Sequence, residues 1–416
     1  MNRILYTVLL LIPTIFTLGQ TNTSSPYSRF GLGELQNNVF SEFNAIGGGV
    51  TGFSSSNNIN PYNPASYTSF SSNSFLLSTG LRHKTVNMEN NIDEQRTNNS
   101  SFSHFVIGFP ISRKVGASIG ILPYSNMGYD VTSRDSIYNT DLSYLGDGGI
   151  SKIYFGGAYA ISNKISIGLN ASYLFGAINK RKMVIFNDET FLNSRSNDKI
   201  NLKGYYYELG LMYKDVINEN QAISFGVTAN NKSEISSKQE LLIETFDYSG
   251  ISETIKDTSL YTINRGYTVL PQYISFGGTY LQNNKWLIVA DYSMQNWGDY
   301  RSFNQSDSLI NSMRFSAGLQ YTPDYNSVTQ YYKRMQYSIG GSYSNTPLQF
   351  YDNQLKEMSI RFGLGIPIKR TRTKYDFSCT IGSRGTTDNN LIKEQFVIFG
   401  LGISFDAIWF VKRKYD

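Results

Sequence analysis

Residues 165–175 read ISIGLNASYLF, and this stretch decides the fold class. Apolar residues occupy every second position, and serine, glycine and asparagine fill most positions between them. Successive side chains of a β-strand point to opposite faces, so a strand here has one apolar and one small or polar face. The same alternation returns near the C-terminus, where residues 397–405 read VIFGLGISF.

Alternating segments of this kind recur from Phe70 onward, and their number, weaker ones included, is about fourteen. Their centres are Leu77, Ile107, Ile119, Phe155, Leu169, Leu209, Phe225, Phe276, Ile288, Ala317, Ile339, Leu364, Phe377 and Leu401. An even number of strands is typical of a single-chain bacterial barrel with both ends on one side of the membrane. The sequence therefore predicts an all-β fold, a transmembrane antiparallel β-barrel of about 14 strands.

The connections between the segments alternate in length. Residues 88–100 and 186–199 are long connections, whereas 112–114 and 162–163 are tight, and 233–264 is the longest. Short periplasmic turns and longer external loops produce this rhythm in outer-membrane barrels. We therefore expect the long connections to be external loops.

Five charged residues fall on the polar faces of the predicted strands. On the registers above, the side chains that should face the lumen are Glu208, Asp291, Arg314, Arg361 and Asp376. A charge on the lipid face at mid-depth costs about 2–4 kcal/mol, so this placement suits a barrel in lipid. Their mixed signs favour an ion-paired interior over an open ion-selective pore, and a purely structural role is the alternative.

Composition narrows the class of protein. Only 17% of residues are charged, 40% are hydrophobic and the mean hydropathy is −0.30, which argues against both a soluble α/β enzyme and a helical membrane protein. The net charge of +5 comes from scattered lysine and arginine residues, so no nucleic-acid partner is expected. The single cysteine, Cys379, excludes an intramolecular disulfide.

The N-terminal region divides into two expected parts. Residues 1–19 have a basic residue, an apolar core and small residues for cleavage, which indicates a signal peptide; the core is short for a transmembrane anchor. Residues 20–69 are rich in serine, asparagine and glycine but carry apolar anchors such as Phe40 and Phe43. We therefore expect a plug, or hatch, rather than a disordered leader, ahead of a barrel over 70–405 and a periplasmic tail over 406–416.

Short motifs in this order resemble a known family. The glycines 47–49 followed by Asn63-Pro64-Ala65, just before the first strand, resemble the FadL/OmpP1/TodX outer-membrane transporters. The stretches 25–34 (SPYSRFGLGE), 122–129 (LPYSNMGY) and 409–414 (WFVKRK) are similar to the Bacteroidota branch of that family. The resemblance extends over essentially the whole chain after the signal peptide.

The resemblance implies a barrel closed by an N-terminal hatch, with a kinked third strand that opens a lateral window. Pro123 lies in the third segment, and because proline removes a ladder donor it should mark a bulge or gap; the alternative is a strand that ends at Leu122. The implied ligand or gate residues are Asn63, Pro64, Ala65, Leu122, Pro123 and Tyr124, with the first three lying against that gap.

No catalytic chemistry is evident in the sequence. His83 and His104 are the only histidines, neither lies beside a nucleophile motif, and no zinc-ligand spacing or phosphate-binding glycine loop occurs. We expect no enzyme activity, metal or cofactor.

Two functions remain open from the sequence. The first is passive transport of hydrophobic, fatty-acid-like small molecules across the outer membrane, with lateral exit near the third strand. The second is a non-transporting structural or accessory subunit of an outer-membrane secretion or barrel-assembly complex, a role that the resembled branch also fills. The expected partners are outer-membrane lipid, a hydrophobic ligand and complex subunits.

Overall fold

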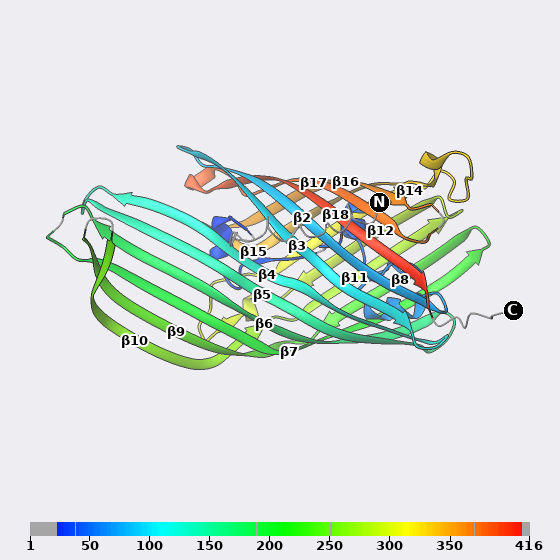
Figure 1. Cartoon of the computed structure of the whole chain (residues 1–416), viewed down its shortest axis with the longest axis horizontal. Coiled ribbons are helices and arrows are strands. Elements are labelled where there is room, and N and C mark those ends of the chain that lie inside the picture. The colour runs from blue at the N-terminus through cyan, green and yellow to red at the C-terminus, as the bar shows by residue number, and fades with distance from the viewer. Residues whose placement is uncertain (1–22, 38, 189, 250–251, 370, 410–416) are drawn as a thin grey trace, which may run out of the picture.

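Fourteen strands close into an antiparallel barrel in the computed structural model, which describes residues 23–37, 39–188, 190–249, 252–369 and 371–409 (Figure 1). This confirms the predicted fold class. The barrel strands are β2 (Ser74–Glu89), β3 (Glu94–Pro110), β4 (Val115–Asp135), β5 (Thr140–Ala160), β6 (Ile165–Phe186), β7 (Asn193–Asn218), β8 (Gln221–Asn230), β11 (Tyr273–Gln282), β12 (Trp286–Gln295), β14 (Ser312–Tyr321), β15 (Gln336–Phe350), β16 (Asn353–Pro367), β17 (Lys374–Arg384) and β18 (Lys393–Ile408). Each predicted segment centre lies in a different one of these strands.

The barrel closes where its last strand pairs with its first. β18 pairs with β2 along its whole length, and Ile408 lies opposite Ser74. The strands thus begin at residue 74 and end at 408, so the barrel boundaries differ by a few residues from the predicted 70 and 405. The predicted signal peptide, 1–19, and residues 410–416 of the predicted tail lie outside the described residues.

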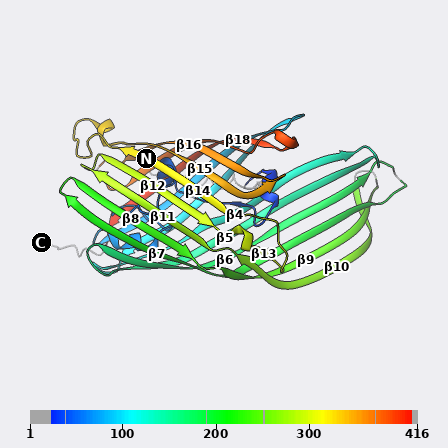
Figure 2. The same ribbon diagram turned by 180° about the vertical axis from the view of Figure 1, so that it is seen from behind.

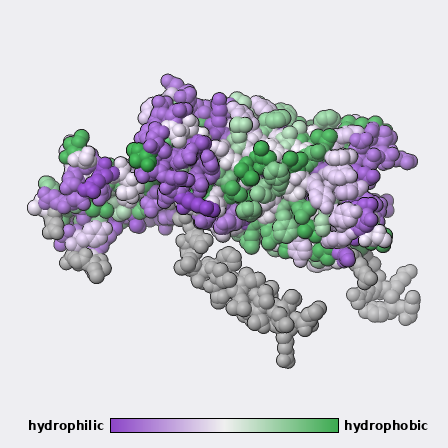
Figure 3. Space-filling model, turned by 90° about the horizontal axis from the view of Figure 1, so that it is seen from above, coloured by the Kyte–Doolittle hydropathy of each residue, from purple (hydrophilic) through white to green (hydrophobic). Residues whose placement is uncertain are grey.

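An apolar belt surrounds the barrel because the alternating side chains point outward. Leu209 is 60% exposed, Phe225 56% and Phe315 52%, and most barrel strands contribute a comparable residue. Figure 3 shows hydrophobic residues over the middle of the barrel, with hydrophilic residues towards both ends. This is the surface that a barrel in lipid requires. Among the described residues, no helix is long and apolar enough to span a membrane.

A tall one-sided wall extends the barrel at one end (Figures 1 and 2). The hairpin of β9 (Ser233–Ser249) and β10 (Ser252–Leu270) pairs with Asn193–Lys203 of β7, beyond the part of β7 that pairs with β8. The prediction of a long loop over 233–264 is therefore wrong. The strand was missed because two register shifts with β9, between Ile255 and Asp257 and between Thr258 and Leu260, interrupt the alternation of β10.

The other connections predicted as long loops are also mainly strand. Residues 88–100 contain the end of β2 and the start of β3, joined by the four residues 90–93. Residues 186–199 contain the last residue of β6 and the first seven residues of β7, joined by the six residues 187–192. These strand ends are polar on both faces because they project past the apolar belt. Longer irregular connections occur at 296–311, with η4 (Trp297–Asp299) and β13 (Arg301–Ser302), at 322–335, with η5 (Tyr331–Arg334), and at 385–392, with η6 (Asp388–Asn390).

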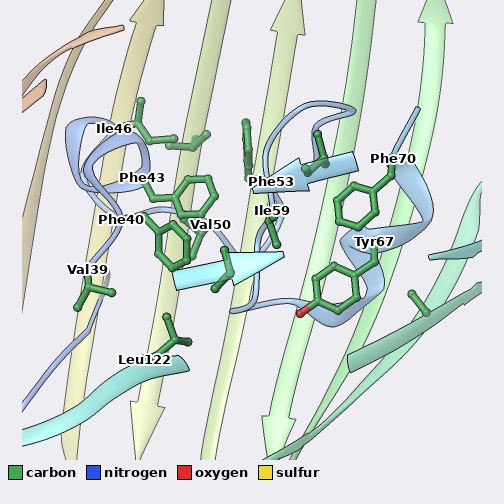
Figure 4. Close-up of a cluster of buried hydrophobic side chains, with 14 of the residues drawn as sticks. Val39, Phe40, Phe43, Ile46, Val50, Phe53, Ile59, Tyr67, Phe70 and Leu122 are labelled. Carbon is green, nitrogen blue, oxygen red and sulfur yellow. The ribbon is translucent and has the colours of Figure 1, made fainter. Parts of the chain in front are cut away.

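The N-terminal segment, residues 23–70, crosses the interior of the barrel. It contains η2 (Pro26–Arg29), β1 (Glu34–Leu35), α2 (Ser41–Ala45) and η3 (Pro64–Ser69). α2 lies against β16 and β17, whereas η3 lies against β5, β6 and β7 on the other side. Its side chains Phe40, Phe43, Val50, Phe53 and Ile59 belong to one buried cluster (Figure 4).

Candidate ligand-binding site

A seam divides the barrel wall between β3 and β4. Their ladder covers only Phe105–Pro110 of β3 and Gly116–Ile121 of β4, although both strands are described in full and continue well beyond it. Residues 94–104 of β3, apart from Ser103, therefore pair with β2 but not with β4. We call this stretch the β3–β4 seam.

Two bulges mark the start of the seam. β4 continues through Pro123 to Asp135, so it does not end at Leu122, and its register with β5 shifts between Pro123 and Ser125. On the other side, Ser103 of β3 is left out of the ladder with β2, where the register shifts between Gly80 and Leu81. A bulge bends its strand, so both strands turn away from their neighbour at the same level.

A short part of the N-terminal segment occupies the seam. We call residues Glu34–Asn37 together with Val39 the strap. Leu35 lies opposite Ser125 in a two-residue pairing with β4, and the Gln36 amide donates to the Tyr124 carbonyl oxygen at 3.0 Å. On the β3 side, the Ser103 hydroxyl donates to the Val39 carbonyl oxygen at 2.8 Å. The strap thus takes the place of β3 beside β4.

Ion pairs hold the strap to the opposite strands. The Glu34 carboxylate lies 2.6 Å from the Lys84 ammonium of β2 and 3.5 Å from the Arg384 guanidinium of β17. Burial alone raises the pKa of Glu34, but Lys84 and Arg384 outweigh it and hold that pKa well below its usual range. Arg384 also pairs with Glu394 at 2.5 Å, and Gln36 accepts a hydrogen bond from Arg82 at 2.6 Å.

A cavity of about 320 Å³ lies behind the strap, inside the barrel. Leu122, Pro123 and Tyr124 line it at the seam, with Tyr206 and Trp297 among the other aromatic residues. Six basic and four acidic side chains also line it: Arg82, Lys84, Lys152, Arg314, Arg361, Arg384, Glu34, Glu208, Asp291 and Glu357. Its size lies within the range of small-molecule sites, and its lining is both apolar and charged.

The predicted luminal charges lie inside the barrel, and four of the five line this cavity. Glu208 pairs with Lys152 at 2.9 Å, and Asp291 accepts hydrogen bonds from the backbone amides of Val50 and Thr51, each at 2.7 Å. Arg314 and Arg361 are the other two. Asp376 lies apart, 3.0 Å from the Lys374 ammonium.

The predicted gate residues separate into two groups. Leu122, Pro123 and Tyr124 lie together at the cavity, but Asn63, Pro64 and Ala65 do not line it. Pro64 packs on Gly168 of β6 and the Asn63 amide donates to the Leu211 carbonyl oxygen of β7 at 3.3 Å. The structure corrects the expectation that this triplet lies against the Pro123 gap, because η3 is seated on β5–β7 several residues further down the wall.

No prediction from the sequence identified the strap, Arg82, Lys84 or Arg384. The register of β2 and β17 could have placed the three basic residues in the lumen, since each follows the same alternation as the five that were found. No local signal identifies the strap, because its pairing with β4 joins residues about ninety positions apart in the sequence.

A second buried carboxylate, Glu42 of α2, lies near Asp376. The Ser404 hydroxyl donates to Glu42 at 3.3 Å and to Asp376 at 3.1 Å, and the other Glu42 oxygen has no hydrogen-bond partner among the described residues. Burial, together with the charge of Asp376, raises the pKa of Glu42 to about 8. Within the described residues, no group of three or more His, Cys, Asp or Glu side chains could hold a metal ion.

The raised pKa of Glu42 predicts a pH-dependent stability. Between the usual carboxyl pKa and about 8, the folded protein keeps a proton that the unfolded chain releases, so the free energy of unfolding should fall as pH rises through this window. Glu42→Gln should remove most of this fall. The measurement is the melting temperature of the parent and the variant at pH 5 and pH 9, followed by heat-modified gel mobility. An unchanged pH profile in Glu42→Gln would contradict this assignment.

The chain matches a known protein family over its whole given length. The BamG family model matches residues 1–416. The chain belongs to the BamG family. No curated protein matches it.

Solved structures share the fold at low sequence identity. The P. putida toluene transporter TodX is similar with a TM-score of 0.63 and 13% identity, covering 91% of this chain and 100% of TodX. The Ralstonia pickettii toluene transporter TbuX has a TM-score of 0.61 and 13% identity, covering 89% and 98%. A FadL homologue of Pseudomonas aeruginosa has a TM-score of 0.55 and 10% identity, covering 93% and 99%. The resemblance to FadL and TodX is confirmed for the fold, and the Bacteroidota branch stays a prediction.

Proposed function

We propose that this chain is an outer-membrane barrel that passes hydrophobic small molecules through its luminal cavity and releases them sideways through the β3–β4 seam. The observation that carries the proposal is the contact of the cavity with the seam at Leu122, Pro123 and Tyr124. Proteins of similar structure include a toluene transporter and a monoaromatic hydrocarbon channel, which supports a hydrophobic ligand.

The N-terminal segment acts as the plug in this proposal, because it blocks the axial route. Its backbone lies so close to the wall that a Cβ atom added at Gly116, Gly168, Gly226 or Gly318 would overlap Tyr67, Pro64, Thr51 or Ile46. These contacts come from strands on several sides of the barrel. In this proposal, a molecule in the cavity therefore leaves sideways.

The strap acts as the gate in the same proposal. It is held by its two-residue pairing with β4 and by the hydrogen bonds that it makes with Tyr124, Ser103 and Arg82. The ion pairs of Glu34 add to these contacts. A short segment held in this way can leave the seam without unfolding the barrel, since the wall strands keep their own ladders. Its departure would open the cavity to the bilayer.

Replacing the proline tests the seam. Pro123→Val adds a backbone N–H donor and removes the restriction that the proline ring places on the backbone angle φ. β4 should therefore pair more regularly and the seam should narrow. We expect uptake of labelled toluene and dodecanoate into vesicles that contain the purified protein to slow by at least about threefold. Pro110→Val, at the far end of β3, is the matched control and should leave uptake unchanged; equal uptake by both variants would count against the lateral route.

An accessory subunit of an outer-membrane secretion or barrel-assembly complex is the second candidate. Two observations favour it. The chain matches the BamG family, whereas the proteins of similar structure bear the names of channels and transporters. In addition, the outer edge of β10 has no strand partner between Ser252 and Gly266 among the described residues. An unpaired edge offers a row of backbone donors and acceptors to another chain. If this candidate is right, the protein purified in mild detergent should carry stoichiometric partners, and the Tyr261→Lys/Ile263→Lys variant should lose them. The purified barrel should then show no uptake of labelled ligand into vesicles.

A further inference from the structure

The connection between β14 and β15 is unusually long for its end of the barrel. We call residues 322–335 the flap. They lie at the end where β2 begins and β18 ends, which is the periplasmic end of a single-chain bacterial barrel. The other connections at this end, 111–114, 161–164, 219–220, 283–285 and 368–373, have two to six residues, whereas the flap has fourteen. Short turns are the rule on this side, so the flap requires an explanation.

The flap has a defined conformation. The Asp324 amide donates to the Lys333 carbonyl oxygen at 2.8 Å, which closes the flap across its base. The Tyr331 hydroxyl donates to the Pro367 carbonyl oxygen at 2.5 Å, which ties η5 to the end of β16. The side chains that the flap presents to its surroundings are therefore held in place.

The flap starts and ends at a row of aromatic side chains. Trp286 of β12 lies opposite Tyr321 of β14, which lies opposite Tyr337 of β15. The ring centres of Trp286 and Tyr321 are 4.2 Å apart, and the Tyr337 hydroxyl donates to the Tyr332 carbonyl oxygen of the flap at 3.0 Å. Aromatic residues of this kind mark the level at which the hydrocarbon core of a membrane meets the head groups. In Figures 1 and 2 the flap, coloured gold, stands out to one side of the barrel at this end.

Apolar and basic side chains lie together on the flap. Val328 is 96% exposed and Tyr332 56%. Lys333 and Arg334 follow directly in the chain, and the Lys369 ammonium of the neighbouring turn lies 5.6 Å from the centre of a tyrosine ring of η5. These three basic groups have no carboxylate oxygen within 4.0 Å among the described residues, where the ion pairs nearest to them join other side chains. The flap itself contains a single acidic residue.

Phospholipid fits this surface better than a protein partner does. Apolar and aromatic side chains next to lysine and arginine are typical of segments that lie in the head-group layer, with the basic groups on the lipid phosphates. A flap that begins at the aromatic row and stands to the side of the barrel meets that layer first. A protein in the periplasm would instead be met by a connection that continues along the barrel axis.

We propose that the flap lies in the head-group layer of the periplasmic leaflet and binds anionic phospholipid. Val328 and Tyr332 enter the interface between the head groups and the hydrocarbon. Lys333, Arg334 and Lys369 contact the phosphate groups. This inference rests on the proposed outer-membrane placement and is independent of what the cavity carries.

The depth of Val328 tests the first part of the proposal. The chain has one native cysteine, so Val328→Cys in a Cys379→Ser background can carry a single fluorescent maleimide in the full-length protein, held in lipid nanodiscs. Ile137→Cys is the matched control, because Ile137 is also apolar, is 84% exposed and lies between β4 and β5 at the other end. We expect spin-labelled lipid to quench the label at position 328 at least about threefold more strongly than the label at 137, and acrylamide to show the reverse order. Equal acrylamide quenching at both positions would place the flap in water and overturn the proposal in favour of a protein-facing surface.

Lipid selectivity tests the second part. Native mass spectrometry of the delipidated protein from an uncharged detergent should show phosphatidylglycerol binding about tenfold more tightly than phosphatidylethanolamine with the same acyl chains. Lys333→Gln/Arg334→Gln should weaken phosphatidylglycerol binding by about tenfold and change phosphatidylethanolamine binding by less than about twofold. Arg113→Gln/Lys114→Gln removes two exposed basic residues from a short turn at the same end and should bind both lipids like the parent. Equal binding of the two lipids, or unchanged phosphatidylglycerol binding in Lys333→Gln/Arg334→Gln, would overturn the proposal.

Two further measurements separate this inference from the proposed function. Heat-modified gel mobility of Lys333→Gln/Arg334→Gln should match that of the parent, because the flap lies outside the ladders of the barrel. The same variant should take up labelled toluene like the parent. A parent protein that binds phosphatidylglycerol through the flap but passes no ligand into vesicles would overturn transport and leave the lipid site standing. Intact uptake without lipid selectivity would overturn the lipid site alone.

Discussion

A disulfide between the strap and β4 should stop lateral uptake. Leu35 and Ser125 are directly paired residues of antiparallel strands, so cysteines at both positions meet the Cα separation that a disulfide requires. The oxidised Leu35→Cys/Ser125→Cys variant, made in a Cys379→Ser background, would keep the strap in the seam. We expect uptake of labelled dodecanoate into vesicles to fall by at least about tenfold, because the cavity loses its exit to the bilayer.

Reduction of the same protein provides the control. Dithiothreitol should restore uptake, which separates the effect of the crosslink from that of the two substitutions. A matched crosslink, Thr85→Cys/Asn98→Cys, joins paired residues of β2 and β3 outside the cavity and should leave uptake unchanged whether oxidised or reduced. Full uptake by the oxidised strap variant would mean that ligand does not leave through this seam.

Gly226→Ala should displace the N-terminal segment from the wall. A Cβ atom at this position of β8 would overlap the Thr51 carbonyl oxygen and come within 2.8 Å of the Asn63 side-chain amide. Both contacts involve backbone or buried groups that cannot move aside easily, so the segment must shift. We expect the free energy of unfolding to fall by about 1–3 kcal/mol and the barrel to show larger single-channel currents in planar bilayers.

Gly157→Ala is the matched control for this prediction. Gly157 also lies in a barrel strand, β5, but an added Cβ atom would meet nothing within 4 Å. Its stability should stay within about 0.5 kcal/mol of the parent, and its currents should not change. Similar behaviour of the two variants would show that close packing of the segment on β8 is not what holds it in place.

The barrel could be predicted from the sequence because its driving force is local and periodic. In segments such as 165–175, lipid outside and a polar interior impose a period of two, and the alternation of residues is a direct record of these two surroundings. The luminal position of Asp291 and Arg361 follows from the same register. The hairpin of β9 and β10 was missed because two register shifts interrupt the alternation of β10, most of whose side chains are exposed.

The candidate site could be predicted only in part. Pro123 signalled an irregular strand through its own covalent chemistry, and the structure has a register shift there. The position of Asn63, Pro64 and Ala65 on β5–β7 depends on how the whole N-terminal segment folds, which no short motif determines. Arg314 and Arg361 likewise donate hydrogen bonds to one hydroxyl, that of Ser342, only because β14, β15 and β16 stand side by side.

Sequence alone therefore determined which residues face outward and which face inward, because a strand has only two faces and each has a fixed neighbour, lipid or lumen. The tertiary structure decided which inward residues meet one another. Arginines from four strands share one cavity, and a strap replaces β3 beside β4, because closure of the barrel brings together residues far apart in the chain. Such contacts arise from long-range packing, which leaves no period in the sequence.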